Sequence, residues 1–138
     1  MLTDRQGLPL AVKTTGANVR DETQTLPLLK AMPAVPTSHG RLRRQPRALY
    51  GDRGYGFPRT IAEVQQRGIV SKLDPRASPH GSGLGAVRYV VERSLAWFGQ
   101  FRRLKICYEK HGQYFQAFHD LAACLLCFAR LRQVTAGL

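Results

Sequence analysis

Apolar residues recur at helical spacing most clearly in residues 114–131, near the end of the chain. The repeating positions are Tyr114, Phe118, Leu121, Ala122, Leu125, Phe128 and Ala129. These positions fall on one face of a 3.6-residue repeat, which predicts an amphipathic helix. We expect this helix to contribute the largest single share of the hydrophobic core.

The segment from Arg88 to Lys105 begins with a second helical stretch, for which Gly99 is the predicted end. Its apolar face consists of Val87, Val90, Val91, Ser94, Leu95, Trp97 and Phe98. Glu92 falls with Arg88 and Arg93 on or beside the other face, so its carboxylate is predicted to point away from the core.

Two interpretations of Glu92 stay open at this point. Arg88 and Glu92 are spaced as an i, i+4 surface ion pair, which contributes only about 0.3 to 0.5 kcal/mol. Alternatively, Glu92 is a metal-binding carboxylate, and the arginines around it face phosphate.

Short apolar runs predict three strands, Leu8 to Thr15, Ala48 to Gly51 and Ile69 to Leu73. A turn from Thr3 to Gly7 precedes the first strand, and only Met1 and Leu2 stand before that turn. We therefore expect the chain to begin inside a sheet whose earlier part lies in missing upstream sequence.

Two further helices are predicted between the strands. One runs from Phe57 to Arg67 and is closed by Gly68. The other spans residues 22–32, with Asp21 as its N-cap and Pro27 within its first two turns. At 138 residues the chain has room for one domain.

Two loops hold residues of possible functional interest. The first is basic, and its arginines are either solvated or in contact with phosphate: Arg41, Arg43, Arg44 and Arg47. The second, residues 74–85, is rich in glycine and proline and is predicted to be a flexible loop. Its glycines, Gly81, Gly83 and Gly85, are a poor match to a phosphate-binding loop, since no Gly-Lys-Ser/Thr sequence follows.

The charge balance favours a polyanionic partner. Lys and Arg number 21 against 9 Asp and Glu, which gives a formal net charge of +12. Nucleic acid is the first candidate for such a partner and an acidic membrane surface the second.

Cysteine usage and hydropathy predict a protein of the cytoplasm. The three cysteines are too few for a disulfide-rich secreted domain. Cys124 and Cys127 are expected to pack in the core of the last helix rather than to bind zinc. The start of the chain lacks the pattern of a signal peptide, and the longest apolar run, Leu121 to Ala129, is too short to cross a bilayer.

Asp52 and Glu92 are the residues that best fit a catalytic site. The four histidines are scattered, so neither a metal-binding pair nor a hydrolase triad is supported. Asp52 follows the strand Ala48 to Gly51, at the edge where α/β sheets collect ligands, although an ordinary Asp-x-Gly turn is an equal alternative. Paired carboxylates that hold divalent metal ions act on phosphodiesters.

Two motifs, Tyr50-Gly-Asp-Arg-Gly-Tyr55 and Arg88-Tyr-Val-Val-Glu-Arg-Ser-Leu-Ala-Trp97 followed by Phe101-Arg-Arg-Leu104, resemble bacterial insertion-sequence DDE transposases, in particular the carboxyl part of the insertion sequence five family. The resemblance extends over nearly the whole chain. It implies an α/β fold of the ribonuclease-H-like type with a mixed sheet, truncated at the N-terminus.

The same resemblance implies a site of three carboxylates on two Mg²⁺ ions, with Mn²⁺ as an alternative. Asp52 matches the second acid and Glu92 the third. The residues expected to meet DNA, at the terminal inverted repeats of an insertion sequence, are Arg43, Arg44, Arg88, Arg93, Arg102, Arg103 and Lys105. Related transposases often have a tyrosine where this chain has Gly85, and a basic residue where it has Gly99.

The first aspartate of the family has no counterpart in this chain. It would lie before Met1, and Asp4 is a poor substitute because it stands in a turn. The chain is therefore expected to be inactive alone, as the downstream product of a split transposase or a remnant of one. An upstream fragment or a full-length transposase is the expected partner. The alternatives are a non-catalytic, basic DNA-binding or regulatory module and a general coating protein of nucleic acid.

Overall fold

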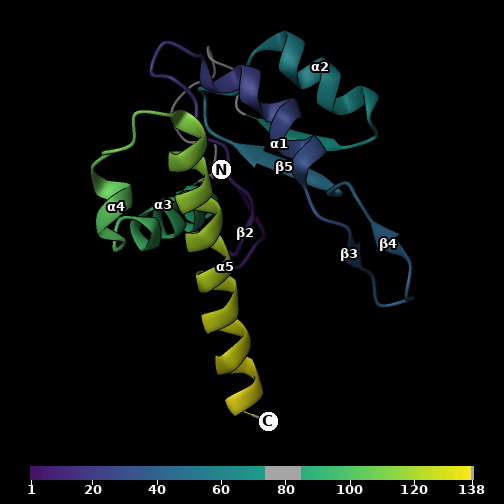
Figure 1. The fold of residues 1–138 in the computed structure, drawn as a ribbon. Helices are drawn as coiled ribbons and strands as arrows, with labels where there is room; N and C mark the ends of the chain where they lie inside the picture. The colour runs from purple at the N-terminus through teal and green to yellow at the C-terminus, as the bar shows by residue number, and fades with distance from the viewer. Residues whose placement is uncertain (74–84, 138) are drawn as a thin grey trace. The chain divides into compact units, whose positions relative to one another are not determined.

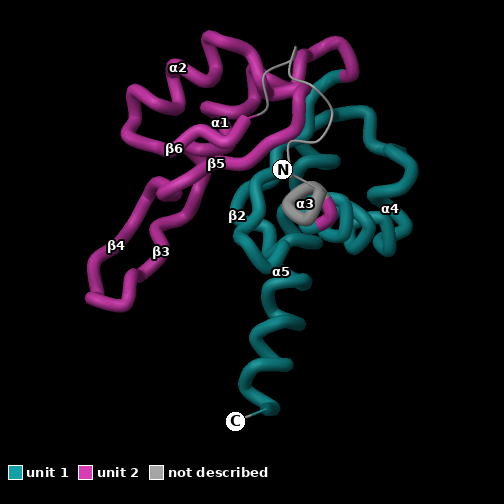
Figure 2. The backbone as a smooth tube through the Cα atoms, turned by 180° about the vertical axis from the view of Figure 1, so that it is seen from behind, with its two compact units in different colours: residues 1–16, 90–138 teal, residues 17–89 magenta. Residues whose placement is uncertain are grey.

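The computed structural model describes residues 1–73 and 85–137, with side chains omitted for 85–88. These residues divide into two compact units, which Figure 2 colours separately. Unit 1 contains residues 1–16 and 90–138, and unit 2 contains residues 17–89.

The content of helix and strand is mixed, as Figure 1 shows. The strands pair as three separate two-stranded sheets within the described residues. The mixed α and β character is thus confirmed, whereas the single continuous sheet expected for a ribonuclease-H-like fold is not formed among these residues. The described helices include none that is both long and apolar enough to cross a membrane.

The most regular part of unit 2 is a parallel strand pair joined by a helix. Strand β5 (Ala48–Gly51) lies parallel to β6 (Val70–Leu73), with Ala48 opposite Val70 and Gly51 opposite Leu73, and α2 (Pro58–Gln66) connects them. This confirms the two strands and the helix predicted from the sequence. The buried residues that hold the three elements together are Leu49, Val64, Ile69 and Leu73.

The ends of α2 follow the expected chemistry. Pro58 occupies the first turn, where its missing N–H costs no hydrogen bond. Gly68 has a φ of +73°, the left-handed conformation of a residue that follows a helix. Its backbone N–H donates to the Gln65 carbonyl at 2.8 Å.

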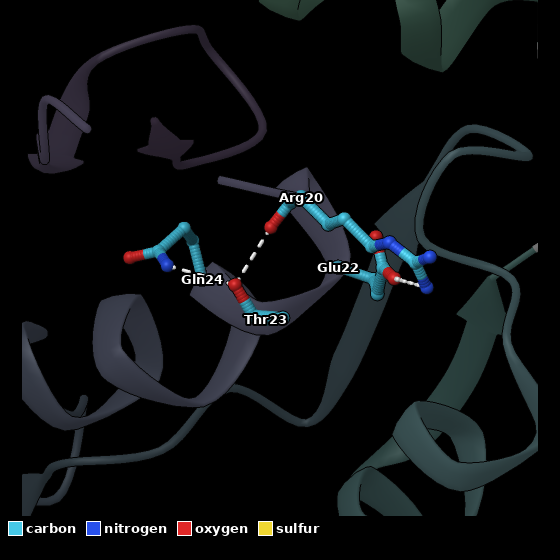
Figure 3. A network of polar contacts seen from close by, with 4 residues as sticks. All are labelled: Arg20, Glu22, Thr23 and Gln24. Carbon is cyan, nitrogen blue, oxygen red and sulfur yellow. Dashed lines mark hydrogen bonds and ion pairs between the residues drawn. The ribbon is translucent and has the colours of Figure 1, made fainter. Parts of the chain in front are cut away.

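The first helix of unit 2 begins differently from its prediction. A 3₁₀ turn, η1 (Asp21–Gln24), precedes α1 (Thr25–Ala31), and Asp21 lies inside that turn rather than capping a helix. The hydrogen bond at the start of this turn comes from Thr23, whose hydroxyl donates to the Arg20 carbonyl at 2.7 Å (Figure 3). The N-cap prediction for Asp21 is therefore wrong. Pro27 falls in the first turn of α1, where it is tolerated.

Unit 2 also contains an antiparallel hairpin of β3 (Val35–Pro36) and β4 (Leu42–Arg43). The backbone N–H of Thr37 donates to the Arg41 carbonyl at 2.8 Å, and Gly40 has a φ of +73°. The predicted basic loop is thus partly a hairpin.

In unit 1 the chain begins with the predicted hairpin. Strand β1 (Leu2–Thr3) pairs antiparallel with β2 (Pro9–Ala11), so the second strand is shorter than the predicted Leu8 to Thr15. Pairing ends at Ala11 because the partner strand β1 has only two residues. Beyond β2, the backbone N–H of Thr14 donates to the Gln116 side chain at 2.7 Å.

The remaining helices of unit 1 are α3 (Gly85–Phe98), which starts in unit 2, α4 (Arg102–Lys105) and α5 (Gly112–Ala136). The end of α3 just before Gly99 confirms the prediction. Ser94 and Phe98 are buried, whereas Leu95, predicted on the apolar face, is 53% exposed.

The role predicted for the last helix is wrong. Of its residues only Ala122 is buried, and the predicted core positions Leu121, Leu125 and Phe128 are exposed. The packed face carries Phe115 and His119 instead, and His119 stacks on Phe98 with ring centroids 5.9 Å apart. Ala122 was among the predicted core positions, whereas Phe115 and His119 were not, so the packed face is rotated round the helix axis relative to the predicted one and shares only part of it.

Cys124 and Cys127 also lie outside the packed face of α5. Both residues are exposed and neither forms a disulfide, so their predicted core packing is also wrong. The Cys127 thiol reaches the Pro9 carbonyl at 3.8 Å. Although the residue is exposed as a whole, partial burial of its thiol is the main cause that raises the pKa of Cys127, followed by the charges of Cys124 and Asp4.

Candidate functional site: two exposed acids and two basic clusters

Asp52 stands immediately after β5, at the carboxyl end of the parallel strand pair, and it is exposed. Its Oδ1 atom accepts a hydrogen bond from the Gly54 N–H at 2.9 Å, while its carbonyl accepts one from the Tyr55 N–H at 3.1 Å. The Asp-x-Gly turn is therefore present, and it fixes the acid at the strand end. The Oδ2 atom receives no hydrogen bond from another described residue, so a turn role and a ligand role are compatible.

Tyr55 lies against this strand end. The sequence indicated this residue only as the last position of the Tyr50 to Tyr55 motif. An added Cβ at Gly51 would lie 2.7 Å from Leu73 Cδ2 and 3.5 Å from Tyr55 Cβ, so a larger residue there would require the buried Leu73 side chain to move. Burial, and then the negative charges of Asp21 and Asp52, raise the pKa of the Tyr55 hydroxyl. A protonated phenol therefore stands near two carboxylates of unit 2.

Glu92 is exposed on α3, in agreement with the prediction that its side chain leaves the core. Among the described residues it forms no ion pair. The predicted pair with Arg88 lies outside the described part of the chain, since only the backbone of residues 85–88 is described.

The stretch of α3 that carries Glu92 is fixed to the first hairpin by its next two residues. The buried Ser94 hydroxyl lies 2.7 Å from the Gly7 carbonyl and 2.9 Å from the Val90 carbonyl, either of which it can donate to. Arg93 donates to the Gln6 carbonyl at 2.7 Å, and its guanidinium lies 5.2 Å from the centre of the Trp97 ring. Arg93 thus has a packing role, beside which its predicted contact with DNA stays a prediction.

Gly7 makes this contact between hairpin and helix possible. It has a φ of +87°, and a Cβ there would lie 2.8 Å from Ser94 Oγ and 3.2 Å from Arg93 Nη2. Asp4 closes the same turn, because its Oδ1 accepts the N–H groups of Gln6 and Leu8, both at 2.8 Å. The sequence did not reveal that this turn packs on the helix of Glu92, although a serine within the apolar face was a signal.

The predicted basic residues form one cluster in each unit. In unit 1, Arg102, Arg103 and Lys105 are exposed on α4. Arg103 also pairs with Glu109 at 3.5 Å and lies 4.8 Å from the centre of the Phe118 ring. In unit 2, Arg44 is exposed and Arg43 half-buried, on or next to β4.

The two acids belong to different units, Asp52 to unit 2 and Glu92 to unit 1. No group of three potential metal-ligating side chains occurs among the described residues. The chemistry of the two carboxylates nevertheless suits Mg²⁺, which prefers oxygen ligands and is commonly held by one or two carboxylates. Of the glycines in the predicted flexible loop, Gly81 and Gly83 lie outside the described residues.

Comparison with known proteins identifies the family. Residues 1–127, a range that includes both acids, match the family model described as the transposase DDE domain. The whole chain is 44% identical to a putative transposase for insertion sequence element IS402 from Burkholderia cepacia, and it spans 65% of the length of that relative. No solved structure matches the chain. This chain belongs to the DDE transposase family of bacterial insertion sequences.

Proposed function

We propose that Asp52 and Glu92 are two of the three metal-binding carboxylates of a DDE transposase site that cleaves and joins DNA at the ends of an insertion sequence. The observation that carries this proposal is the exposure of both acids on ordered elements within the family match. Asp52 keeps one carboxylate oxygen without a described hydrogen bond, and Glu92 forms no described ion pair. The complete catalytic domain has a ribonuclease-H-like fold, of which this chain forms a single partial domain.

Members of the family generally use divalent metal ions. Mg²⁺, or Mn²⁺ in its place, would lower the pKa of an attacking water and stabilise the attacking and leaving oxygens of the phosphodiester. The protein supplies oxygen ligands through Asp52 and Glu92. The Gly54 N–H orients Asp52, and the contact of Ser94 with the Gly7 turn orients the helix that carries Glu92.

The DNA-binding part of the proposal rests on the basic clusters. Arg102, Arg103 and Lys105 contact phosphates at the terminal inverted repeats, and Arg43 and Arg44 extend that contact. Arg88 stands four positions before Glu92 and Arg93 directly after it, and both act on the same DNA or orient the acid. The protein acts in the bacterial cytoplasm, associated with the nucleoid.

The 138-residue polypeptide has no Mg²⁺-dependent cleavage activity by itself under this proposal. It contains the counterparts of the second and third acids, and the first comes from an upstream transposase fragment or a full-length transposase. Cleavage of element ends by the purified 138-residue polypeptide would contradict this part of the proposal.

A chimera tests the roles of the two acids. The part of the Burkholderia cepacia relative that this chain does not cover is joined to the chain, and cleavage of labelled element ends is measured in Mg²⁺. Asp52→Ala and Glu92→Ala should each abolish cleavage while DNA binding in a gel-shift assay is retained. Glu63→Ala is the matched control, since Glu63 is an acid of α2 whose described ion pair is with the exposed Arg59.

A second candidate function is a non-catalytic DNA-binding or regulatory module, which the net charge of +12 and the exposed arginines favour. Such a module would occupy element ends or inhibit a full-length transposase. Its inhibition of transposition in cells would be unaffected by Asp52→Ala and Glu92→Ala but lost with Arg102→Ala and Arg103→Ala combined. If the unaltered chimera cleaves DNA and each of Asp52→Ala and Glu92→Ala abolishes that cleavage, the catalytic proposal is supported over the non-catalytic module.

A further inference from the structure

The hairpin of β3 and β4 extends away from the helices of unit 2 (Figure 1). None of the residues 35–44 is buried. The turn at the tip is closed by the backbone, because the Thr37 N–H donates to the Arg41 carbonyl and the Gly40 N–H donates to the Thr37 carbonyl. A Cβ added at Gly40 would have no described atom within 4 Å. The hairpin is thus a projection whose surface is open to a partner.

The segment that contains this hairpin carries only positive charge. Residues 23–51 have no Asp or Glu, whereas they have these basic residues: Lys30, Arg41, Arg43, Arg44 and Arg47. None of the five forms an ion pair with another described residue. Such a surface attracts a polyanion, and its charge favours DNA over a protein partner. The inference below rests on the proposed function in that DNA is the ligand.

Two apolar side chains stand within this basic surface. Pro36 and Leu42 are opposite each other in the register of the hairpin, so they project from the same face. Both are exposed, and Leu42, at 65%, is the most exposed of the large apolar side chains among the described residues. The next pair along the ladder, Val35 and Arg43, projects from the other face. Contact with phosphate explains the arginines but not this apolar pair.

We propose that the hairpin enters the minor groove of the bound DNA, where Pro36 and Leu42 wedge between two neighbouring base pairs, unstack them and bend the duplex. Apolar wedges of this kind, proline and leucine among them, kink DNA toward the major groove by about 20 to 90°. The proline ring has little side-chain freedom to lose on insertion. Arg41 and Arg43, on either side of Leu42 in the sequence, contact phosphates at the edges of the groove.

The residue types on the face of Pro36 and Leu42 favour the minor groove. The major groove of undistorted DNA admits a two-stranded ribbon, but base pairs are distinguished there mainly by hydrogen bonds. The side chains of Pro36 and Leu42 cannot form such bonds. The minor groove is only about 6 Å wide, so the ribbon enters it as the wedge opens the base step. The steps that unstack most easily, such as TA, are therefore the preferred sites.

Fluorescence of labelled DNA measures the bend and the unstacking separately. The probe is a short duplex with one central TA step and with a donor and an acceptor dye at its two ends. A second version has 2-aminopurine in place of an adenine of that step. In buffer without divalent metal, the 138-residue chain should increase both the energy transfer between the dyes and the fluorescence of 2-aminopurine. A gel-shift assay confirms that the DNA is bound in each measurement.

Substitutions separate the wedge from the phosphate contacts. Leu42→Ala should abolish both increases without a change in the salt dependence of binding, because no phosphate contact is removed. Leu42→Met should retain both, since methionine also acts as a wedge. Val70→Ala, at a 55% exposed position of β6, is the matched control and should retain them too. Arg41→Ala and Arg43→Ala combined should make the slope of log K against log salt concentration shallower by about 2, with unstacking retained at saturating protein.

Bound DNA without either increase would overturn the wedge, because a contact of Leu42 with a thymine methyl group in the major groove leaves the stack intact. Increases with the 138-residue chain but not with the chimera would overturn it as well, since another part of a complete transposase would then cover the hairpin. Asp52→Ala and Glu92→Ala should leave both increases unchanged, so a failure of the catalytic proposal is distinguishable. Absence of DNA binding would overturn this inference together with the DNA-binding part of the proposed function.

Discussion

At the scale of single residues, the position of Glu92 depends on a glycine far away in the sequence. Gly7 lies 87 residues before Ser94, yet its carbonyl is 2.7 Å from the Ser94 hydroxyl. Hydrophobic periodicity predicted that Glu92 faces away from the core, because that property depends on α3 alone. It could not predict the contact, because a close approach of two backbones leaves no periodic signal beyond a glycine and a small polar residue.

Replacement of Gly7 by alanine should destabilise the protein through two separate effects. The left-handed φ of +87° costs a residue with a Cβ about 1 to 2 kcal/mol. The new Cβ would also lie 2.8 Å from Ser94 Oγ, which adds a steric cost. Gly40→Ala is the matched control, since φ is +73° there and no atom lies within 4 Å of the added Cβ. In urea denaturation, Gly7→Ala should lower the unfolding free energy more than Gly40→Ala does. Equal decreases would rule out the packing contact between Gly7 and Ser94.

Ionisation of Tyr55 should make the unfolding free energy of the protein depend on pH in the alkaline range. Its pKa is raised in the folded state, so the protonated phenol stabilises the fold. That stabilisation is complete below the unfolded pKa of about 10 and is lost as pH rises through the folded pKa. Tyr55→Phe should therefore reduce the fall in unfolding free energy between about pH 9 and pH 11. Tyr50→Phe, on the neighbouring strand, is the control. An unchanged pH dependence in Tyr55→Phe would show that the phenol titrates normally.

At the scale of elements, sequence patterns predicted the β5, α2 and β6 segment well. An apolar run, a helical spacing closed by Gly68 and a second apolar run are local signals, and the three elements pack on one another. The pattern of α5 was equally clear, but most of its predicted core positions are exposed. Periodicity identifies an apolar face without identifying what covers it.

Val64 should be the most sensitive position of the segment from β5 to β6. Its side chain is 0% exposed between the helix and the strands. Val64→Ala removes two buried methyl groups and leaves a cavity, so about 2 kcal/mol of unfolding free energy should be lost. Val70→Ala, on β6 at a position 55% exposed, is the control and should cost well under half as much. Chemical denaturation followed by circular dichroism measures both, and similar losses would mean that α2 does not pack on the sheet as described.

At the scale of the whole molecule, charge was the most informative property of the composition. The formal net charge of +12 indicated a polyanionic partner before any motif was considered, and the family match agrees with nucleic acid. The carboxylates proposed as metal ligands, Asp52 and Glu92, were identified by motif, because two acids in a basic chain have no compositional signal. They belong to different units, and a local sequence pattern does not predict which distant residues act together.

The net charge leads to a measurable dependence of DNA binding on salt. Each phosphate that a Lys or Arg neutralises contributes about −0.9 to the slope of log K against log salt concentration. If Arg102 and Arg103 each contact a phosphate, their replacement by alanine should make the slope shallower by about 2 and weaken binding to all sequences alike. Arg59→Ala is the control, because this exposed arginine of α2 pairs with Glu63 at 3.0 Å and is outside both basic clusters. An unchanged slope in the double variant would remove α4 from the DNA-binding surface. A loss of preference for element ends without a change in slope would instead assign the two arginines to recognition of bases, since phosphate contacts carry no direct sequence information.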